Sequence, residues 1–349
     1  MSTMLLEPKL ETPTVNSNPA NYYVASINSQ AFAYDASVKP RKDIQALATK
    51  AGYNPAYLPM FTNYSNRLQE KLETIEDNSL VLLQVPTYNS LATDRAMVDG
   101  LKAKGCTLVM WVHDIDCLRG FHESPYEDML MLDKADIVIV PSKKMLDWVN
   151  IHTSVTQQNF IVHEAWDYLT ELGEVEPNSI FNKPAESNIC YAGNLSSAKV
   201  DFLQTINTDI DVYGKGNQAK FTNNNVHYQG CASAEYLPKV LKKYSAGLVW
   251  DSGNYNHYLD YNWSHKASLY LASGIPVIAK KGTHVGNFAE DHNCGVTIKS
   301  LDELKDLHLP ENLTVHEIGK DMRRGYFINR TLDVINQIID LGGIYHEFL

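Results

Sequence analysis

The sequence lacks any apolar run of roughly 18 or more residues, the minimum for a helix that crosses a bilayer. Its first twenty residues also lack the basic and apolar regions of a signal peptide. Basic residues are outnumbered, with 30 Lys and Arg against 41 Asp and Glu and a net charge of −11. No long basic run offsets this balance, which argues against duplex nucleic acid as a partner. We therefore expect a cytoplasmic protein with no transmembrane segment.

Cysteine is scarce as well. The five cysteines are an odd number and contain no CxxC pair. This usage predicts reduced, mostly buried thiols, with no disulfide framework and no zinc site.

What the sequence does contain is a repeated alternation of short β-branched runs and amphipathic stretches, which is typical of parallel sheets covered by helices. The first half predicts strands at 22–27, 80–85, 107–112, 136–140 and 160–165, with helices near 40–51, 64–76, 92–104, 124–133 and 142–150. The second half predicts strands at 189–193, 210–214, 226–230, 247–250, 276–279 and 295–298, with helices near 197–206, 234–244, 265–273 and 300–306, and a long one within 313–340.

The alternation lapses in one stretch, residues 168–188, where Pro, Asn and Glu collect. We expect a disordered arm over 1–20, a doubly wound domain over 21–167, a linker over 168–188, a second such domain over 189–312, and a helix within 313–349 that closes onto the first domain. Two α/β domains joined in this way bind a ligand in the cleft between them, at the carboxyl ends of the strands.

Three loops at strand ends of the second domain suit a phosphate. "YAGNLSSAK" has a small residue leaving the strand and a lysine entering the next helix, so backbone can approach an anion that the lysine neutralises. "VYGKG" either places an aromatic ring against a nucleobase or merely reverses the chain. The candidate ligand-binding residues are Gly193 and Asn194 with Lys199 in the first loop, and Tyr213 and Gly214, beside Lys215, in the second.

The third loop, "YNWSHKASLYLASGIPVIAK" (261–280), puts a lysine where a helix begins. Ser264 is expected to cap the helix, with His265 and Lys266 in its first turn. A cation there opposes the helix dipole unless an anion is bound nearby. Substitution of Lys266 is therefore expected to harm activity more than stability. An exposed lysine on a capped helix is the alternative interpretation of this loop alone.

These segments carry a resemblance. "AGNLSSAK", "VYGKG" and "WSHKASLYLASGIPVIAKKGTHVGNF" resemble the C-terminal nucleotide-sugar domain of GT-B glycosyltransferases, and "WVHDIDCLRG" resembles a His-Asp-Ile-x-x-Leu-Arg motif of the same family. Within this class, the segments most resemble the bacterial glucosyltransferases that extend N-acetylglucosamine on serine-rich repeat adhesins, a family whose relatives include galactofuranosyltransferases. The resemblance covers roughly residues 22–340.

The resemblance implies a GT-B fold, with two Rossmann-like doubly wound domains facing a cleft, an acceptor domain first and a nucleotide-sugar domain second. It implies transfer of a hexose, glucose first, from a UDP-sugar to a sugar acceptor such as N-acetylglucosamine on a glycoprotein, by a homo-oligomer. Positions matching Lys199 and Lys266 would contact the diphosphate. In the first domain, His113, Asp114 and Arg119 follow the expected strand 107–112. An imidazole or carboxylate there could take the proton of an attacking sugar hydroxyl, with the arginine orienting it. The plainer alternative is a turn capped by Asp114 and paired with Arg119.

The triplet Asp114-Ile115-Asp116 also spells the D-x-D of metal-dependent glycosyltransferases. It recurs at Asp209-Ile210-Asp211 inside an expected strand, which shows how readily it arises. Two repeated domains favour the metal-independent plan, in which lysines and a helix N-terminus stabilise the leaving group. We expect no metal and no cofactor beyond the UDP-sugar, which is the donor substrate.

Two further stretches and three other functions stay open. The segment 28–44 reads either as a cleft loop carrying Lys and Arg or as a mobile surface loop, and Tyr255, Tyr258, Tyr261 and Trp263 form an aromatic segment that could shape the pocket. A nucleotide-sugar 2-epimerase would share the two-domain plan. A galactofuranosyl- or other hexosyltransferase of polysaccharide assembly would use the same site. A non-catalytic subunit of a glycosylation complex, either one that binds a UDP-sugar or one that recognises a glycosylated protein and supports a partner transferase, would also keep the fold. The second kind would need neither Lys199 nor Lys266.

Overall fold

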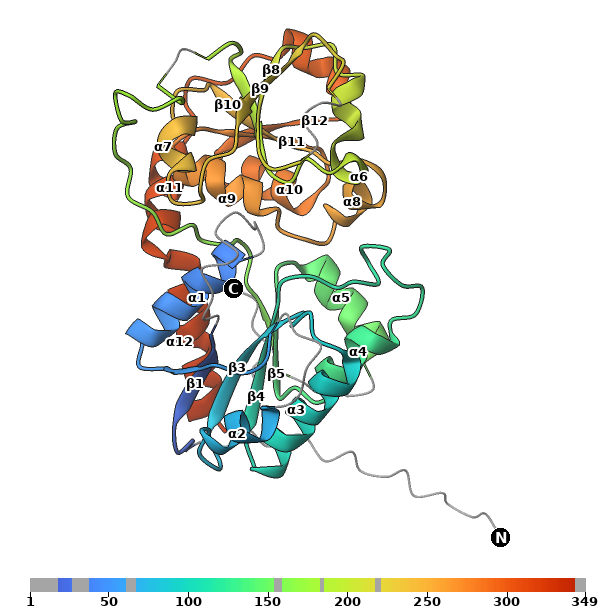
Figure 1. Cartoon of the computed structure of the whole chain (residues 1–349), viewed down its shortest axis with the longest axis vertical. Helices are drawn as coiled ribbons and strands as arrows, with labels where there is room; N and C mark the ends of the chain where they lie inside the picture. Colours follow the sequence, from blue (N-terminus) through green and yellow to red (C-terminus); the bar gives the residue numbers. More distant parts are fainter. Residues whose placement is uncertain are drawn as a thin grey trace.

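The computed structural model describes residues 18–26, 38–60, 67–153, 159–182, 185–216 and 221–342, which form two parallel sheets of six strands each. Figure 1 shows two lobes, one above the other, with the first half of the chain below and the second half above. The expected fold class, two doubly wound α/β domains, is confirmed. Among the described residues, no helix is both long and apolar enough to cross a bilayer.

The first sheet has the strand order β2-β1-β3-β4-β5-β6. Its two central strands, β3 and β4, pair in register from Leu80 with Thr107 to Val85 with Val112. Every residue of both strands is buried, because helices cover both faces of the sheet. The strands are β1 (Tyr22–Ala25), β2 (Asn54–Ala56), β3 (Leu80–Val85), β4 (Thr107–Val112), β5 (Ile137–Val140) and β6 (Asn159–Val162). The helices are α1 (Val38–Lys50), α2 (Leu68–Glu73), α3 (Leu91–Ala103), α4 (Tyr126–Leu132) and α5 (Lys143–His152).

Two expectations for the first domain need correction. The sequence did not predict β2, a short edge strand whose proline is tolerated there because an edge strand can leave a backbone position unpaired. Lys39 and Arg41 lie in the first turn of α1, so the part of segment 28–44 from residue 38 on is helix. Residues 27–37 lie outside the described residues, as do residues 1–17 of the expected arm and residues 61–66, which include the start of the helix expected near 64–76.

The second sheet has the order β12-β11-β10-β7-β8-β9. The strands are β7 (Ile189–Ala192), β8 (Ile210–Tyr213), β9 (Val226–Gly230), β10 (Ala246–Val249), β11 (Val277–Lys280) and β12 (Gly295–Ile298). The helices are α6 (Ser197–Val200), α7 (Leu237–Leu241), α8 (Gly253–Tyr258), α9 (His265–Ala272) and α10 (His284–Asp291), with 3-10 turns η1 (Asp201–Gln204) and η3 (Leu301–Asp306). The helix expected near 197–206 is thus a short α-helical turn followed by a 3-10 turn, and the one near 300–306 is 3-10. The sequence did not predict α8 and α10.

Each sheet reverses its strand order once, between β1 and β3 in the first domain and between β7 and β10 in the second. At such a switch point the connections leave to opposite faces of the sheet, which opens a crevice at the carboxyl ends of the two strands. The residues that follow β3 in the first domain, and β7 and β10 in the second, therefore lie at these crevices, and those that follow β4, the strand next to β3, lie at the same edge.

The C-terminal helix expected within 313–340 is two helices, α11 (Val315–Arg324) and α12 (Tyr326–Asp340). They are broken at Gly325, whose φ of 80° is left-handed and favours glycine. A Cβ on Gly325 would also lie 2.2 Å from Cδ1 of Leu47 in α1. α11 packs against α9 of the second domain, whereas α12 packs against α1 and β6 of the first, so the chain returns across the molecule at this glycine (Figure 1).

Candidate active site

A cleft of about 890 Å³ lies between the two domains, at the carboxyl ends of both sheets. All eleven candidate ligand-binding and catalytic residues taken from the sequence line it, although they come from four separate segments. These are His113, Asp114, Arg119, Gly193, Asn194, Lys199, Tyr213, Gly214, Ser264, His265 and Lys266. The structure therefore gathers all of them around one cavity that is large enough for a nucleotide sugar.

The charge of the cleft is opposite to that of the chain. Its lining carries six lysines and arginines but two carboxylates, in a protein of net charge −11. The cations are Lys39, Arg41, Arg119, Lys199, Lys215 and Lys266, and the carboxylates are Asp114 and Asp251. Such a concentration of one sign in a concave, low-dielectric wall attracts anions.

Lys266 is ion-paired within the cleft. Its Nζ lies 2.8 Å from Oδ1 of Asp251, which follows β10 and also accepts a hydrogen bond from the Tyr191 hydroxyl at 3.1 Å. The two charged side chains are 12% and 7% exposed. Sequence reasoning missed Asp251, although an acidic residue one position past the expected strand 247–250 was a usable signal. The pair holds the lysine at the start of α9, beside the switch point.

The N-terminus of α9 has no side-chain cap. Ser264 occupies the N-cap position with extended backbone (φ −72°, ψ 121°), but its hydroxyl makes no capping hydrogen bond, so the expected capping is wrong. His265 stacks on Tyr168 with ring centroids 5.1 Å apart. Burial, and secondarily nearby Lys39, lowers the pKa of His265 to about 3, so its imidazole is neutral. Its buried Nε2 has no hydrogen-bond partner among the described residues.

The loop after β7 brings backbone and a second lysine to the same place. A Cβ on Gly193 would lie 3.1 Å from Cε of Lys266, so this glycine permits the close approach of the lysine. Asn194 uses its carboxamide oxygen to accept from the Ser196 N–H at 2.8 Å, which shapes the turn. Lys199 lies over the Tyr255 ring, 4.5 Å from its centroid. Burial, and then the charge of Lys266, lowers the pKa of Lys199.

The loop after β8 forms a wall of the cleft. Tyr213 is 1% exposed, and its hydroxyl lies 2.6 Å from that of Tyr244, which donates to Asp211. Gly214 has φ 150°, and a Cβ there would lie 1.8 Å from the carbonyl oxygen of Gly193, so the two loops touch through their glycines. Asp211 belongs to the second D-x-D triplet and is fully buried in β8, where it serves packing.

In the first domain His113 is held on two sides. Its ring stacks on Trp166 at 4.6 Å, and its Nε2 lies 2.9 Å from Oε1 of Gln84. The Gln84 amide nitrogen donates to the carbonyls of Ala25 and Arg41, so the oxygen faces His113 and the imidazole donates from Nε2. Burial, and then the charge of Arg41, lowers the pKa of His113 well below its usual value. This neutral, 7% exposed ring is a weak base.

Asp114 lies closer to solvent and faces both domains. Its Oδ1 accepts from Nδ2 of Asn262 in the second domain at 3.1 Å. Its Oδ2 lies 3.6 Å from a guanidinium nitrogen of Arg119, which also pairs with Asp116 at 2.9 Å. The turn alternative is thus partly right, because Arg119 does pair with Asp114, but the carboxylate still lines the cleft.

The aromatic segment 255–263 connects the domains beside these groups. The buried Tyr258 hydroxyl accepts from the backbone N–H of Ile115 at 3.0 Å. The Tyr261 carbonyl accepts from the hydroxyl of Ser142 at 2.5 Å. Tyr255, Tyr258 and Trp263 line the cleft. This segment therefore forms the side of the cleft where the two domains touch.

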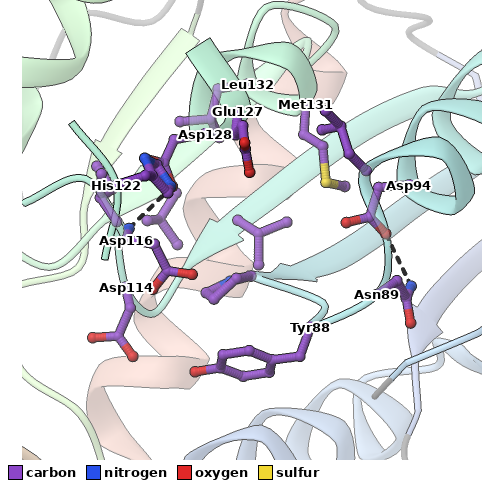
Figure 2. Close-up of a pocket in the computed structure, with 15 residues that line it drawn as sticks. Tyr88, Asn89, Asp94, Asp114, Asp116, His122, Glu127, Asp128, Met131 and Leu132 are labelled. Atoms are coloured by element: carbon purple, nitrogen blue, oxygen red, sulfur yellow. Dashed lines mark hydrogen bonds and ion pairs between the residues drawn. The ribbon is translucent and has the colours of Figure 1, made fainter. Parts of the chain in front are cut away.

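A second, smaller pocket of about 120 Å³ adjoins the cleft in the first domain, and Tyr88 and Asp114 line both cavities (Figure 2). Its described lining holds five carboxylates and no lysine or arginine: Asp94, Asp114, Asp116, Glu127 and Asp128. Tyr88 has φ 58°, an uncommon value for a bulky residue. Sequence reasoning did not foresee this pocket, because its residues come from four separate stretches. The site as a whole pairs a cationic cleft with an acidic side pocket.

Comparison with known proteins gives matches along most of the chain. The model "Glucosyltransferase 3-like, N-terminal domain" matches residues 21–164, and "Glucosyltransferase 3-like, C-terminal domain" matches residues 189–335. Glucosyltransferase 3 of Streptococcus gordonii is 26% identical over 324 residues, covering 86% of this chain and 94% of its own. Beta-1,6-galactofuranosyltransferase WbbI of Escherichia coli K12 is 29% identical over 251 residues, covering 67% and 71%.

A solved structure agrees with the fold. That of Anabaena Alr3699/HepE in complex with UDP superposes with a TM-score of 0.55 at 13% identity, covering 92% of this chain and 97% of that one. At this identity the likeness concerns the two-domain architecture alone.

Proposed function

The chain belongs to the glucosyltransferase 3-like family, and on that premise we propose that it transfers a hexosyl group from a UDP-sugar to a sugar acceptor. Glucose is the donor sugar that the family description favours, and N-acetylglucosamine on a glycoprotein is the acceptor we would test first. The observation that carries the proposal is the cationic cleft, where Lys199 and Lys266 converge on the uncapped start of α9.

The donor diphosphate would lie at the start of α9. Backbone N–H groups at a helix N-terminus and the positive end of its dipole favour phosphate. A bound diphosphate would satisfy these donors and give Lys266 a second anionic partner beside Asp251. As the bond between the anomeric carbon and the phosphate oxygen breaks, negative charge grows on the phosphate, and the two lysines would stabilise it.

The acceptor would approach from the acidic side pocket, whose carboxylates suit the hydroxyls of a neutral sugar. Asp114 lines both cavities, so it is our candidate for the group that takes the proton of the attacking hydroxyl. Arg119 would orient it. His113 is the weaker candidate base, because burial lowers its pKa well below the usual value and its Nε2 is engaged with Gln84. We assign it to the wall that supports Asp114.

We also propose that transfer needs no divalent metal. Arg119 pairs with both carboxylates of the D-x-D triplet, which supports a structural role for that triplet. Excess EDTA should leave transfer by the folded protein intact. Complete loss of transfer that manganese restores would refute this part of the proposal.

The first experiment is a screen of UDP-sugars, including UDP-glucose and UDP-galactofuranose, by UDP release with and without N-acetylglucosaminyl acceptors. Release that depends on the acceptor supports transfer, whereas conversion of the UDP-sugar without any acceptor would identify an epimerase. In a parallel melting experiment, UDP should raise the melting temperature by binding the native state. Equal stabilisation by uridine would contradict phosphates as the anchor.

A further inference from the structure

Three metal-binding side chains lie together outside the cleft. Cys117 and His122 come from the loop after β4, and Asp128 comes from the first turn of α4. One ligand atom of each, the cysteine sulfur, an imidazole nitrogen and a carboxylate oxygen, lies within 4.8 Å of the other two. None of the three lines the cleft, while His122 and Asp128 line the acidic side pocket and lie side by side in Figure 2.

The tautomer of His122 leaves the Nε2 lone pair available to bind a metal ion. Its Nδ1 lies 2.8 Å from the backbone carbonyl oxygen of Ser124. A carbonyl can only accept, so Nδ1 carries the proton and Nε2 keeps its lone pair. That Nε2 lies 3.5 Å from Oδ2 of Asp128. A carbonyl that orients the ring through its other nitrogen is the usual outer-shell partner of a metal-bound histidine.

Asp128 is also held in place. Its two oxygens accept from the backbone N–H groups of Asp116 and Cys117, each at 3.0 Å. Each carboxylate oxygen has a further lone pair, so Oδ2 can keep its hydrogen bond and still bind a cation. The Cys117 sulfur has one weak contact, to the Glu123 carbonyl at 3.7 Å. All three side chains are partly exposed, which leaves an ion a path from solvent.

We propose that Cys117, His122 and Asp128 form a zinc site with three protein ligands and a fourth position open to water. Sulfur, imidazole and carboxylate together suit Zn²⁺ and exclude the hard cations Mg²⁺ and Ca²⁺, which take oxygen ligands. Around a tetrahedral zinc these ligand atoms stand roughly 3.3–3.8 Å apart. The histidine–aspartate pair already has that spacing, and the cysteine sulfur lies within 4.8 Å of the other two ligand atoms, so it would have to move closer when an ion binds. The thiol proton passes to solvent when the ion binds.

The spacing of the ligands explains why the absence of a CxxC pair did not reveal this site. Its ligands are five and six positions apart along the chain, and the reversal of the loop before α4 brings them together. A bound ion would brace the loop that carries Asp114 and Arg119 against α4, away from the phosphate end of the cleft. The inference is therefore independent of donor binding at the start of α9, although His122 and Asp128 line the side pocket that we assign to the acceptor.

The test is titration of the metal-free full-length protein with Co²⁺, a spectroscopic substitute for Zn²⁺. We expect one equivalent to bind with a thiolate-to-cobalt charge-transfer band in the near ultraviolet, and Zn²⁺ to displace it. Cys117→Ser should abolish the band. His122→Gln should weaken Co²⁺ binding by at least about tenfold.

Cys231→Ser is the matched control, since Cys231 is also a partly exposed free thiol but lines the cleft. It should keep the band and its stoichiometry. Zn²⁺ should raise the melting temperature of the unaltered protein and of this control, but not that of Cys117→Ser. A band that persists in Cys117→Ser, or no stoichiometric uptake by the unaltered protein, would overturn the proposal. UDP should stabilise Cys117→Ser and His122→Gln as it does the unaltered protein, so failure of the zinc proposal leaves the donor site a separate question.

Discussion

Lys266 and Asp251 form an ion pair at the point where the second sheet reverses its strand order, with Nζ 2.8 Å from Oδ1. The sequence suggests a lysine that opposes its own helix until a phosphate arrives. The structure supplies a counter-charge from the loop after β10 instead, so Lys266 itself already has an anionic partner. A ligand phosphate would then have to share the lysine with a buried carboxylate.

Lys266→Ala is expected to lose both activity and stability. Loss of one charge-assisted contact to the departing phosphate should cost about 2–4 kcal/mol of transition-state stabilisation, or roughly 30- to 1,000-fold in kcat/KM. The melting temperature should also fall, because Asp251 is left buried without its cation, at about 1–3 kcal/mol. Steady-state kinetics and thermal melts check both effects.

The double variant Lys266→Ala with Asp251→Asn separates the two effects. It removes the stranded charge, so stability should return while transfer stays low. Lys215→Ala serves as a control, because Lys215 lines the same cleft but is exposed. A Lys266→Ala protein that melts early yet retains full specific activity would show that the lysine is structural.

Lys199 should make UDP binding sensitive to alkaline pH. Burial and the neighbouring Lys266 lower its pKa, so it loses its charge at a lower pH than an ordinary lysine. UDP favours the charged form, and its affinity should be full below that lowered pKa and fall as the pH rises through it. Calorimetric titration of UDP across the alkaline range measures this.

Lys199→Arg is the companion variant, because a guanidinium stays charged throughout that range. Its UDP affinity should hold where that of the unaltered protein declines. Parallel decline in both proteins would mean that another group sets the pH dependence.

Asp114→Asn should lower kcat by about 10²- to 10⁴-fold, on the scale of removing a general base. The dissociation constant of UDP should change little, because the carboxylate lies on the acceptor side of the cleft. Asp116→Asn is the control: it also removes a carboxylate partner of Arg119 but lines the side pocket alone. Equal losses in the two variants would point to positioning of Arg119 in place of proton transfer.

Gly325→Ala should destabilise the protein by about 1–3 kcal/mol or more, because it combines a left-handed backbone with a Cβ 2.2 Å from Leu47. Gly342→Ala isolates the backbone part, since Gly342 has φ 73° and open space around its Cβ position. It should lose less stability. Denaturant unfolding of both variants compares them, and equal destabilisation would argue that the contact with α1 is unimportant.

The sequence predicted the two parallel sheets because central strands such as β3 and β4 are buried on both faces and read as continuous apolar runs. It also predicted the eleven candidates that line the cleft, since parallel strands bring their carboxyl ends to one edge. It failed where partners come from distant segments. The ion pair of Lys266 with Asp251 joins two separate segments, and the side pocket is lined by residues from four separate stretches.

The break at Gly325 was readable in part. Two arginines precede this glycine, and basic residues in the last turn followed by Gly are a helix stop signal. The apolar pattern continues on both sides of the glycine, so the sequence predicted one long helix. That pattern persists because α11 and α12 each bury a face, although on different domains.

The described chain passes between the domains at two places, the linker after β6 and the joint at Gly325. Two points fix a line, and a rotation of one domain about that line stretches neither connection. Such a rotation would open and close the cleft by separating segment 258–262 from the first domain. The linker and the backbone of Gly325 would then set how far the cleft opens for a product to leave. One of these two hinge positions, Gly325, lies near the C-terminus, far along the chain from the residues that line the cleft.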